Sequence, residues 1–315
     1  MPHYSIAVAS SIINLMKLNG HEIAEKIYYD LLKRVEALQK KTIIPHLVVI
    51  LVGENPASVA YVNLKQKKGE EIGAKVTILR YPETVTTNEL VEKIKLLNDD
   101  PFVHGILIQR PLPEHLDVEK LELTTAPEKD IDGFHPDSPY TLPLPLAVVN
   151  VLEEVYYPSS ELSESRSIHV LDSTSFRSNN KDFIAWLSQQ NIVLLGKGPT
   201  GGGPILAHLT TLGITPTVID RKTPHPEEIM KQADIIIAAT GRENMVTADN
   251  IKKGVILVGV GVLRGKDGKL TGDYNEEEIK NIASYYTPTP KGVGPINVAL
   301  LMQNLITAAE RQTLK

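Results

Sequence analysis

Short apolar runs alternate with helical patterns between residues 46 and 108, and this alternation constrains the fold more than any other feature of the sequence. The apolar runs are bounded by turn residues and have the length of buried strands. We predict strands near 46–53, 75–80 and 103–108, and helices near 56–73 and 87–98. This order is typical of a βαβαβ unit with a parallel sheet, so we expect an α/β protein.

The second half of the chain has a glycine-rich loop in the same kind of context. The loop begins at Gly196, directly after a predicted strand at 191–195, and a predicted helix follows at 205–212. Gly196, Gly198 and Gly201 fit the pattern GxGxxG. The pattern alone is weak evidence, and here the strand before it and the helix after it supply the context that it needs. Glycines let the backbone approach phosphate oxygens, and a helix N-terminus adds N–H donors and partial positive charge. We predict a Rossmann-like dinucleotide-binding domain; a tight turn without a nucleotide is the structural alternative.

Strands near 215–219, 233–239 and 255–260 would complete this second sheet. Asp220 ends the first of them, about 20 residues after the glycine loop, where an acid accepts hydrogen bonds from the adenosine ribose and favours NAD. Lys197, Arg221 and Lys222 could instead hold a ribose 2′-phosphate, which would favour NADP. The candidate cofactor-binding residues are Gly196, Lys197, Gly198, Thr200, Gly201, Asp220, Arg221, Thr240, Gly241 and Gly261.

Three polar side chains share one face of the helix predicted near 56–73. Ser58, Tyr61 and Lys65 are spaced i, i+3 and i+7, and the helix begins near Pro56, directly after a strand. The stripe therefore starts at the carboxyl end of a parallel strand, where ligands bind in α/β sheets. Taken alone, a lysine close to other lysines would be assigned to a solvated basic face. Two further segments of the chain favour a functional role for Lys65 instead.

The first segment places an amide at a carboxyl strand end, and the second is a polar turn that carries carboxylates. Gln109 ends the strand near 103–108 and is followed by a proline-rich stretch that cannot continue a central strand. Asp132 lies in a polar turn at 129–135, in which Gly133 is free to take a positive φ. Alone, Gln109 would cap a strand end and Asp132 would form a turn.

Taken in order, these motifs resemble the bifunctional methylenetetrahydrofolate dehydrogenase/cyclohydrolase family. They read SxxYxxxK, GILIQxPLP and KDxDGFH, followed by the glycine loop, ADIIIAATG, GDY and TPTPKGVGPINVALL, and they cover nearly the whole chain. The resemblance implies a folate-binding catalytic domain at 1–155, completed by a C-terminal helix at 293–315. It also implies an NAD(P)-binding domain at 183–292. Residues 156–182 are rich in Ser, Asp and Asn, and this composition predicts a linker or surface insertion.

The resemblance also implies a reaction and roles for the residues. The reaction is oxidation of 5,10-methylenetetrahydrofolate with NAD or NADP, then hydrolysis of the methenyl product to 10-formyltetrahydrofolate. Lys65 would be the general base or water activator, with its pKa lowered by partial burial. Gln109 would hydrogen-bond Lys65 and help keep it neutral and aimed. Tyr61 would stack on the pterin or aminobenzoate ring, and Asp132 would accept hydrogen bonds from the pterin. The catalytic set is thus Lys65, Gln109, Tyr61 and Asp132, and Ser58, Pro290 and Gly292 complete the substrate site.

Several positions depart from the family pattern near the cofactor and the cleft. Leu142-Pro143-Leu144-Pro145 replaces Pro-Cys-Thr-Pro, Gly196-Lys197-Gly198 replaces Gly-Arg-Ser, and Asp220-Arg221 replaces His-Ser; Gly259, Leu263 and Lys291 are further departures. They leave the choice between NAD and NADP open. They also leave two alternatives: a monofunctional NAD-dependent dehydrogenase, and a dinucleotide-binding regulatory protein without turnover.

Composition narrows the function classes further. The net charge of −5 and the pI near 6.0 predict no nucleic-acid partner, and no apolar run is long enough to span a bilayer. With no cysteine, disulfides, thiolate metal sites and cysteine nucleophiles are excluded, which fits a reducing compartment, and we expect the cytoplasm. We expect the apolar segment 5–16 to pack against a domain rather than to be a targeting signal. The resemblance implies a homodimer and no required metal.

Overall fold

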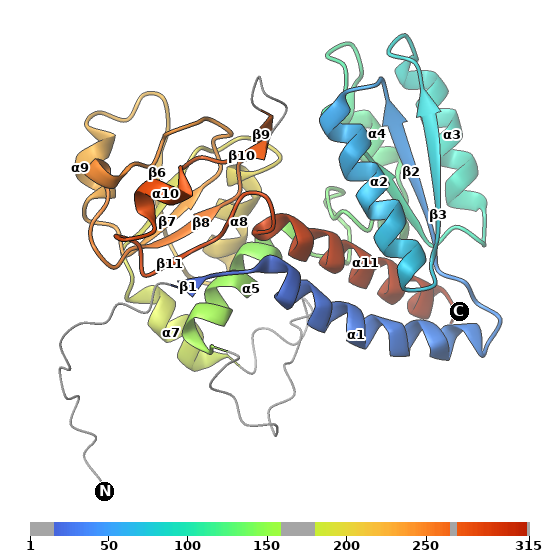
Figure 1. Cartoon of the computed structure of the whole chain (residues 1–315). Coiled ribbons are helices and arrows are strands. Elements are labelled where there is room, and N and C mark those ends of the chain that lie inside the picture. Colours follow the sequence, from blue (N-terminus) through green and yellow to red (C-terminus); the bar gives the residue numbers. More distant parts are fainter. Residues whose placement is uncertain (1–15, 159–179, 265–269, 314–315) are drawn as a thin grey trace, which may run out of the picture.

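The structure is a computed structural model that describes residues 16–158, 180–264 and 270–313 of the chain. Figure 1 shows two α/β lobes, and three helices run along one side of both. The N-terminal lobe contains the predicted βαβαβ unit, and the C-terminal lobe contains the glycine-rich loop.

The N-terminal lobe is a three-stranded parallel sheet in the order β3-β2-β4. Its strands are β2 (His46–Val52), β3 (Lys75–Tyr81) and β4 (Gly105–Ile108), and its helices include α2 (Pro56–Glu71) and α3 (Thr87–Asp99). Every residue of β2 is buried, as its apolar run predicts. Local signals fix where the helices start: Asn55 caps α2 with Pro56 in its first turn, and Thr86 and Glu89 form a capping box on α3. The predicted parallel unit is therefore confirmed.

The C-terminal lobe is a six-stranded parallel sheet in the order β1-β11-β8-β7-β5-β6. Its strands are β1 (Met16–Lys17), β5 (Ile192–Leu195), β6 (Thr217–Ile219), β7 (Ile235–Ala238), β8 (Ile256–Gly259) and β11 (Tyr285–Tyr286). Helix α8 (Gly202–Thr211) begins inside the glycine-rich loop, three residues before the predicted start. The first described strand of the chain thus belongs to the second sheet, which corrects the assignment of all of residues 1–155 to the first domain.

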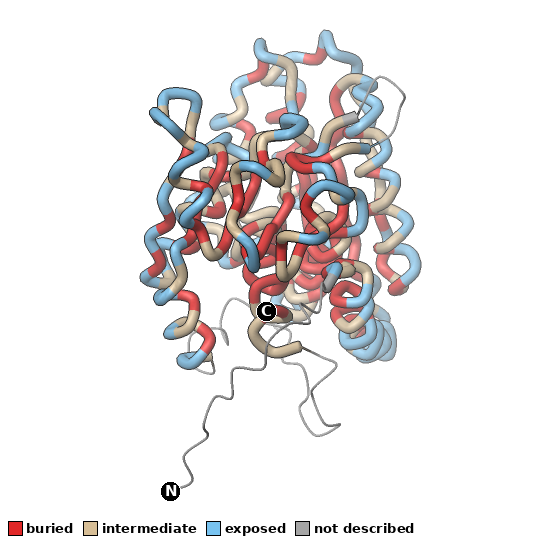
Figure 2. Tube along the Cα trace, turned by 60° about the vertical axis from the view of Figure 1, so that its left-hand side comes forward, coloured by how far each residue is buried: buried red, intermediate tan, exposed pale blue. Residues whose placement is uncertain are grey.

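Three long helices pack beside both sheets. They are α1 (Gly20–Gln39), α5 (Pro143–Tyr156) and α11 (Val293–Gln312). Arg34 of α1 binds Glu310 and the Thr307 hydroxyl of α11. One hydrophobic cluster runs from β2 through these helices to β5 and β7, and Figure 2 shows the buried stretches gathered in the interior. Because this core is continuous, it holds the two lobes in a defined relation.

The remaining elements are short. They are α4 (Val118–Thr124), η1 (Pro127–Lys129), α7 (Lys181–Ser188), α9 (Pro226–Met230), η3 (Ala248–Asn250), β9 (Leu263–Arg264), β10 (Leu270–Thr271) and α10 (Glu276–Ile279). Helix α7 starts within the predicted linker at 156–182, whereas residues 159–179 lie outside the described residues, as do 5–15 of the predicted packing segment. Among the described helices, none is long and apolar enough to cross a membrane.

Candidate active site

The amine of Lys65 and the amide of Gln109 meet at the carboxyl end of the N-terminal sheet. Lys65 Nζ donates to Gln109 Oε1 over 3.0 Å, and both side chains are buried. The other end of the Gln109 amide donates to the Arg110 carbonyl over 2.6 Å, which turns its oxygen toward Lys65. The two residues are neighbours because β2, which leads into α2, pairs directly with β4. The contact that the family resemblance implied is therefore present.

Burial favours the neutral form of Lys65. The cost of desolvating an ammonium lowers the pKa of Lys65, and the carboxyl of Asp132 partly opposes this by raising it. Burial in turn raises the pKa of Asp132, against the influence of Lys65 and Arg110. Gln109 therefore aims the amine, while burial, rather than this amide, favours the neutral form. Burial was the expected cause of the lowered pKa, and Gln109 was expected only to help keep the amine neutral.

Tyr61 lies one helical turn before Lys65, and its ring faces the amine. Lys65 Nζ is 4.8 Å from the centre of the Tyr61 ring. The Tyr61 hydroxyl accepts a hydrogen bond from the side-chain amide of Asn297 on α11, and burial raises the pKa of Tyr61 to about 12. Ser58, a further turn back, is buried on the same helix. The predicted stripe is therefore one surface, and α11 supports it.

Asn297 was not among the residues predicted from the sequence. It lies in the segment TPTPKGVGPINVALL, which contributed to the resemblance, but only as a landmark. Its contact with Tyr61 joins residues that are 236 positions apart, so no local pattern could indicate it.

The turn that carries Asp132 is held by its neighbours. Asp130 accepts hydrogen bonds from the N–H groups of Gly133 and His135, and burial raises its pKa to about 6. Lys129 donates to three backbone carbonyls at the end of α3 over 2.7 to 2.9 Å. Gly133 has φ of +80°, as the turn prediction requires. Asp130 and Lys129 thus build the turn, and Asp132 is the carboxylate coupled to Lys65.

The loop that leads into α11 contains the other two predicted substrate-binding residues. Pro290 follows a cis peptide bond, and the carbonyl of Lys291 accepts from the first N–H of α1. A Cβ atom on Gly20 would lie 1.7 Å from the Gly292 oxygen, so α1 packs directly on this loop. Gly294 and Pro295 lie in the first turn of α11.

The glycine-rich loop has the geometry of a phosphate cradle. Gly196 has φ of +87°, and a Cβ atom on Gly202 would lie 2.0 Å from the Gly196 oxygen. By contrast, nothing lies within 4 Å of where Gly198 would carry a Cβ, so the backbone is open there. Thr200 is exposed in the turn before α8. Open backbone before the N-terminus of a ten-residue helix suits a dinucleotide pyrophosphate.

Asp220 joins the two loops that would surround the adenosine ribose. Its Oδ2 atom lies 2.7 Å from Lys197 Nζ, and its Oδ1 atom accepts from the Lys222 N–H and the Thr223 hydroxyl. The hydrogen bond from Lys197 is the main cause that lowers the pKa of Asp220. Arg221 is exposed beside them. The structure therefore pairs Lys197 with the acid rather than leaving it free.

Thr240, Gly241 and Gly261 lie together at the ends of β7 and β8. The Thr240 and Gly261 N–H groups both donate to the carboxylate of Asp273. The predicted cofactor-binding residues thus line the carboxyl ends of adjacent strands.

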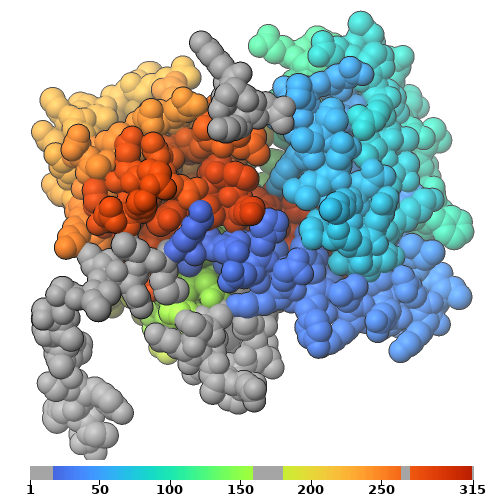
Figure 3. Space-filling model, viewed as in Figure 1, coloured from blue at the N-terminus to red at the C-terminus, as the bar shows by residue number. Residues whose placement is uncertain are grey.

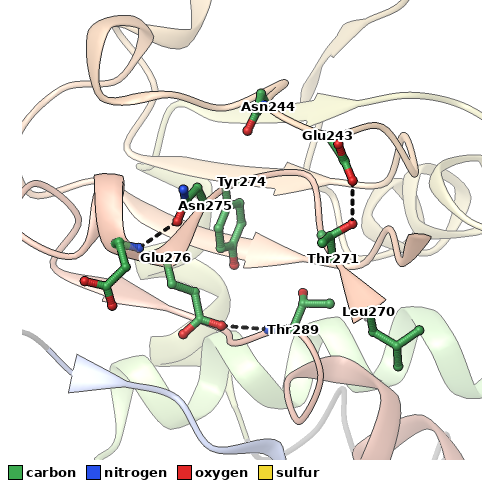
Figure 4. A pocket seen from close by; sticks show the side chains of 10 residues that line it. Glu243, Asn244, Leu270, Thr271, Tyr274, Asn275, Glu276 and Thr289 are labelled. Atoms are coloured by element: carbon green, nitrogen blue, oxygen red, sulfur yellow. Dashed lines mark hydrogen bonds between the residues drawn. The ribbon is translucent and has the colours of Figure 1, made fainter. Parts of the chain in front are cut away.

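A hollow lies between the two lobes, and Figure 3 shows it as a narrow gap between the blue-cyan and orange-red surfaces. A separate cavity of about 460 Å³ opens on the C-terminal lobe, as Figure 4 shows, and it is distinct from the Lys65 site. Its lining residues are Glu243, Asn244, Leu270, Thr271, Gly272, Tyr274, Asn275, Glu276, Glu277 and Thr289. In the described part of the chain, no group of three His, Asp or Glu residues gathers as a metal site.

The fold and these side chains define a class of protein: a two-domain α/β enzyme with a buried amine in one lobe and an NAD(P)-binding lobe beside it. Two family profiles match the chain. The catalytic domain of tetrahydrofolate dehydrogenase/cyclohydrolase matches residues 18–132, and its NAD(P)-binding domain matches residues 181–313. The chain belongs to the bifunctional tetrahydrofolate dehydrogenase/cyclohydrolase family.

Individual relatives agree with this assignment. The bifunctional protein FolD of Enterococcus faecalis is 37% identical, with 94% of this chain and 98% of that protein covered. The crystal structure of the Campylobacter jejuni bifunctional enzyme FolD has a TM-score of 0.80 at 34% identity, with 94% of this chain and 99% of that chain covered. The Trypanosoma brucei enzyme, solved with NADP and an inhibitor, has a TM-score of 0.75 at 27% identity, with 95% of this chain and 99% of that chain covered.

Proposed function

We propose that this chain oxidises 5,10-methylenetetrahydrofolate with a nicotinamide dinucleotide and then hydrolyses the methenyl product to 10-formyltetrahydrofolate. The observation that carries the proposal is the buried amine of Lys65, aimed by Gln109 and flanked by Tyr61 and Asp132. Buried lysines with a lowered pKa are suited to base catalysis near neutral pH.

Lys65 is the base of the hydrolytic step. Its neutral amine accepts a proton from water as the water oxygen bonds to the methenyl carbon. The added hydroxyl then loses its proton as the C=O bond forms, and the bond from this carbon to N5 breaks with its electron pair left on N5. N5 takes up a proton, and the formyl group remains on N10. Gln109 holds the amine in place through the 3.0 Å hydrogen bond, because a base must lie within hydrogen-bonding reach of the water.

The other predicted site residues would make the remaining contacts with the substrate. Tyr61 stacks on an aromatic ring of the folate, with its hydroxyl held by Asn297. Asp132 accepts hydrogen bonds from pterin N–H groups, for which an ionised carboxylate supplies two acceptor oxygens. Ser58, Pro290 and Gly292 border this substrate position.

The oxidation depends on orientation more than on acid or base groups. A bound nicotinamide dinucleotide supplies the hydride acceptor, and the chain supplies the geometry that brings the folate carbon close to it. Gly196, Gly198 and Gly201 would approach the pyrophosphate, and Thr240, Gly241 and Gly261 would border the nicotinamide end.

NAD is the preferred dinucleotide in this proposal. Asp220 carries a carboxylate at the end of β6, and Lys197, one of the cations available for a 2′-phosphate, is already paired with it. A phosphate at this place would face the Asp220 carboxylate. NADP remains the second candidate because Arg221 and Lys222 are exposed nearby, and the Trypanosoma brucei relative was solved with NADP.

The experiment that tests the proposal measures both steps on the wild-type protein. Oxidation of 5,10-methylenetetrahydrofolate is followed with NAD and with NADP, and hydrolysis of the methenyl compound is followed without dinucleotide. Turnover in both, with higher kcat/KM for NAD, is expected. Accumulating methenyl product without hydrolysis would select the monofunctional dehydrogenase, and dinucleotide binding without turnover would select the regulatory protein.

The same assay, applied to a variant of Asp220, tests whether this residue sets the preference between NAD and NADP. Asp220→Ser removes the carboxylate and frees Lys197, so the ratio of kcat/KM for NAD over NADP should fall about tenfold or more. An unchanged ratio would remove Asp220 as its determinant.

We further propose a cytoplasmic homodimer, as the absence of cysteine and the family resemblance suggest. Light scattering on the purified chain tests the dimer, since a monomer mass at assay concentrations would contradict it.

A further inference from the structure

Asp273 is a buried carboxylate that lies between the loops at the ends of β7 and β8. Only 1% of Asp273 is exposed. Its Oδ1 atom accepts from the Thr240 N–H over 3.2 Å, from the Thr240 hydroxyl, and from the Arg242 N–H over 3.3 Å. Its Oδ2 atom accepts from the Gly261 N–H over 3.1 Å. One side chain therefore holds both loops.

The loops that Asp273 joins are packed as closely as backbone allows. A Cβ atom on Gly261 would lie 2.3 Å from Asp273 Oδ2 and 2.5 Å from the Gly241 nitrogen. The strands before them, β7 and β8, are paired neighbours in a parallel sheet, so both loops lie at its carboxyl edge. This edge is where an α/β sheet binds its ligand.

The residues on either side of Asp273 contact the loop before α11, which contains Pro290. A Cβ atom on Gly272 would lie 2.5 Å from the Thr289 hydroxyl, so the chain packs directly on the loop before α11. The Tyr274 hydroxyl donates to the Thr287 carbonyl over 2.6 Å, and the Thr287 hydroxyl accepts from the Gly259 N–H at the end of β8. Residues 272–274 thus tie the ends of β7 and β8 to the loop that contains Pro290.

The position requires a carboxylate rather than an amide. In the part of the chain that the structure describes, the hydrogen-bond donors to Asp273 are three backbone N–H groups and one hydroxyl. Two acceptor oxygens satisfy donors on both sides at once. An asparagine would have to point its NH₂ group at one of these N–H groups, because it has a single acceptor oxygen. One loop would then lose its anchor.

We propose that Asp273 is a positioning residue for the nicotinamide dinucleotide, acting through Thr240, Gly241 and Gly261. It fixes the two loops at the separation that the nicotinamide end requires. The inference rests on the proposed function, since it assigns a role within the same dinucleotide site. The residue itself is separated from the bound molecule by the loops that it holds.

The test uses the two activities of one chain as an internal control. Hydrolysis of the methenyl compound needs no dinucleotide, whereas oxidation does. In Asp273→Asn, the KM for the preferred dinucleotide should rise about tenfold, while kcat at saturation and the hydrolysis rate stay within about twofold. A general structural role would lower both activities together and would not separate KM from kcat.

Asp234→Asn is the matched control. Asp234 lies just before β7, at the opposite end of this strand from Thr240. Like Asp273, it accepts a hydrogen bond from a backbone N–H, that of Asn191. Equal removal of charge there should leave the KM for dinucleotide unchanged.

Several outcomes decide the matter. An unchanged KM in Asp273→Asn, or a parallel loss of both activities, would overturn the proposal. If Asp273→Asn does not fold, Thr240→Val carries the test. This variant removes the hydroxyl that donates to Asp273 and accepts from the Arg242 N–H, and it should raise the KM by a smaller factor. An unchanged KM in this variant would likewise overturn the proposal. Absence of oxidation in the wild type would instead contradict the proposed function.

Discussion

Replacing Lys65 with methionine should remove hydrolysis while leaving the fold intact. Methionine has a similar length and no charge, so it fills the same buried space on α2. General base catalysis contributes about 10²–10⁴-fold to a rate, and we expect the loss of hydrolysis to fall in this range. Oxidation, which needs orientation rather than a base, should fall much less.

The effect on stability can be worked out from the contacts of Lys65. Loss of its hydrogen bond leaves Gln109 Oε1 without this donor in a buried position, which costs about 1–3 kcal/mol. In return, the folded protein no longer buries an amine whose pKa is lowered by desolvation. These contributions oppose each other, so the free energy of unfolding should change by no more than about 2 kcal/mol. The protein should therefore stay folded at assay temperature.

The assay compares hydrolysis of the methenyl compound, oxidation of the methylene compound, and the unfolding midpoint in urea. Lys67→Met is the matched control, since the Lys67 side chain is 72% exposed on the same helix. It should retain both activities. Hydrolysis within about threefold of wild type in Lys65→Met would refute the reasoning, because a base cannot be dispensable.

Three further predictions follow from the surroundings of the site. Asn297→Ala should raise the KM for the folate about three- to tenfold by freeing the Tyr61 ring, and it should have no further effect in a Tyr61→Phe background, as a double-mutant cycle would measure. Lys129→Met should lower the free energy of unfolding by about 2–4 kcal/mol, since three carbonyls at the end of α3 lose a charged donor; chemical denaturation measures this, and a change below 1 kcal/mol would contradict the capping role. Burial lowers the pKa of both His46 and His104 below 6.5, so the stability that they contribute is present above that pH and is lost as the pH falls through their folded pKa values. Thermal melting between about pH 7 and pH 5 should show this loss, and a smaller loss in His46→Gln; an equal loss in both proteins would contradict it.

The sequence predicts the parts of the fold that depend on local pattern. β2 and β4 of the first sheet are apolar runs, and the helices α2 and α3 carry caps, so these elements were found with small errors at the ends. The contact between Lys65 and Gln109 that the family resemblance implied follows from parallel pairing, because strands that share an edge bring their carboxyl ends together.

The features that the sequence did not predict depend on distant partners. Strand β1 has two residues and exists because β11 offers it hydrogen bonds, so no periodicity marks it. The long helix α1 was not predicted from its own residues. Asn297 and Asp273 act across 236 and 33 positions, respectively, and only folding shows that their side chains meet Tyr61 and Thr240.

The choice between NAD and NADP could not be predicted from the sequence for a different reason. Asp220, Lys197, Arg221 and Lys222 were all identified, yet their types alone favoured NAD and NADP about equally. The structure adds the 2.7 Å ion pair between Lys197 and Asp220. Residue types alone do not show which of these side chains pair with each other. This pairing is the physical argument for our proposal that NAD is the preferred dinucleotide.

The central claim is that the buried amine of Lys65 is the base for hydrolysis, and the pH dependence of kcat/KM for the methenyl compound tests it most directly. Burial lowers the pKa of Lys65 from its usual 10.5. The rate should therefore rise with pH through an inflection clearly below 10.5, and this inflection should be absent in Lys65→Met. An inflection at the ordinary lysine value, or the same profile in Lys65→Met, would contradict the account.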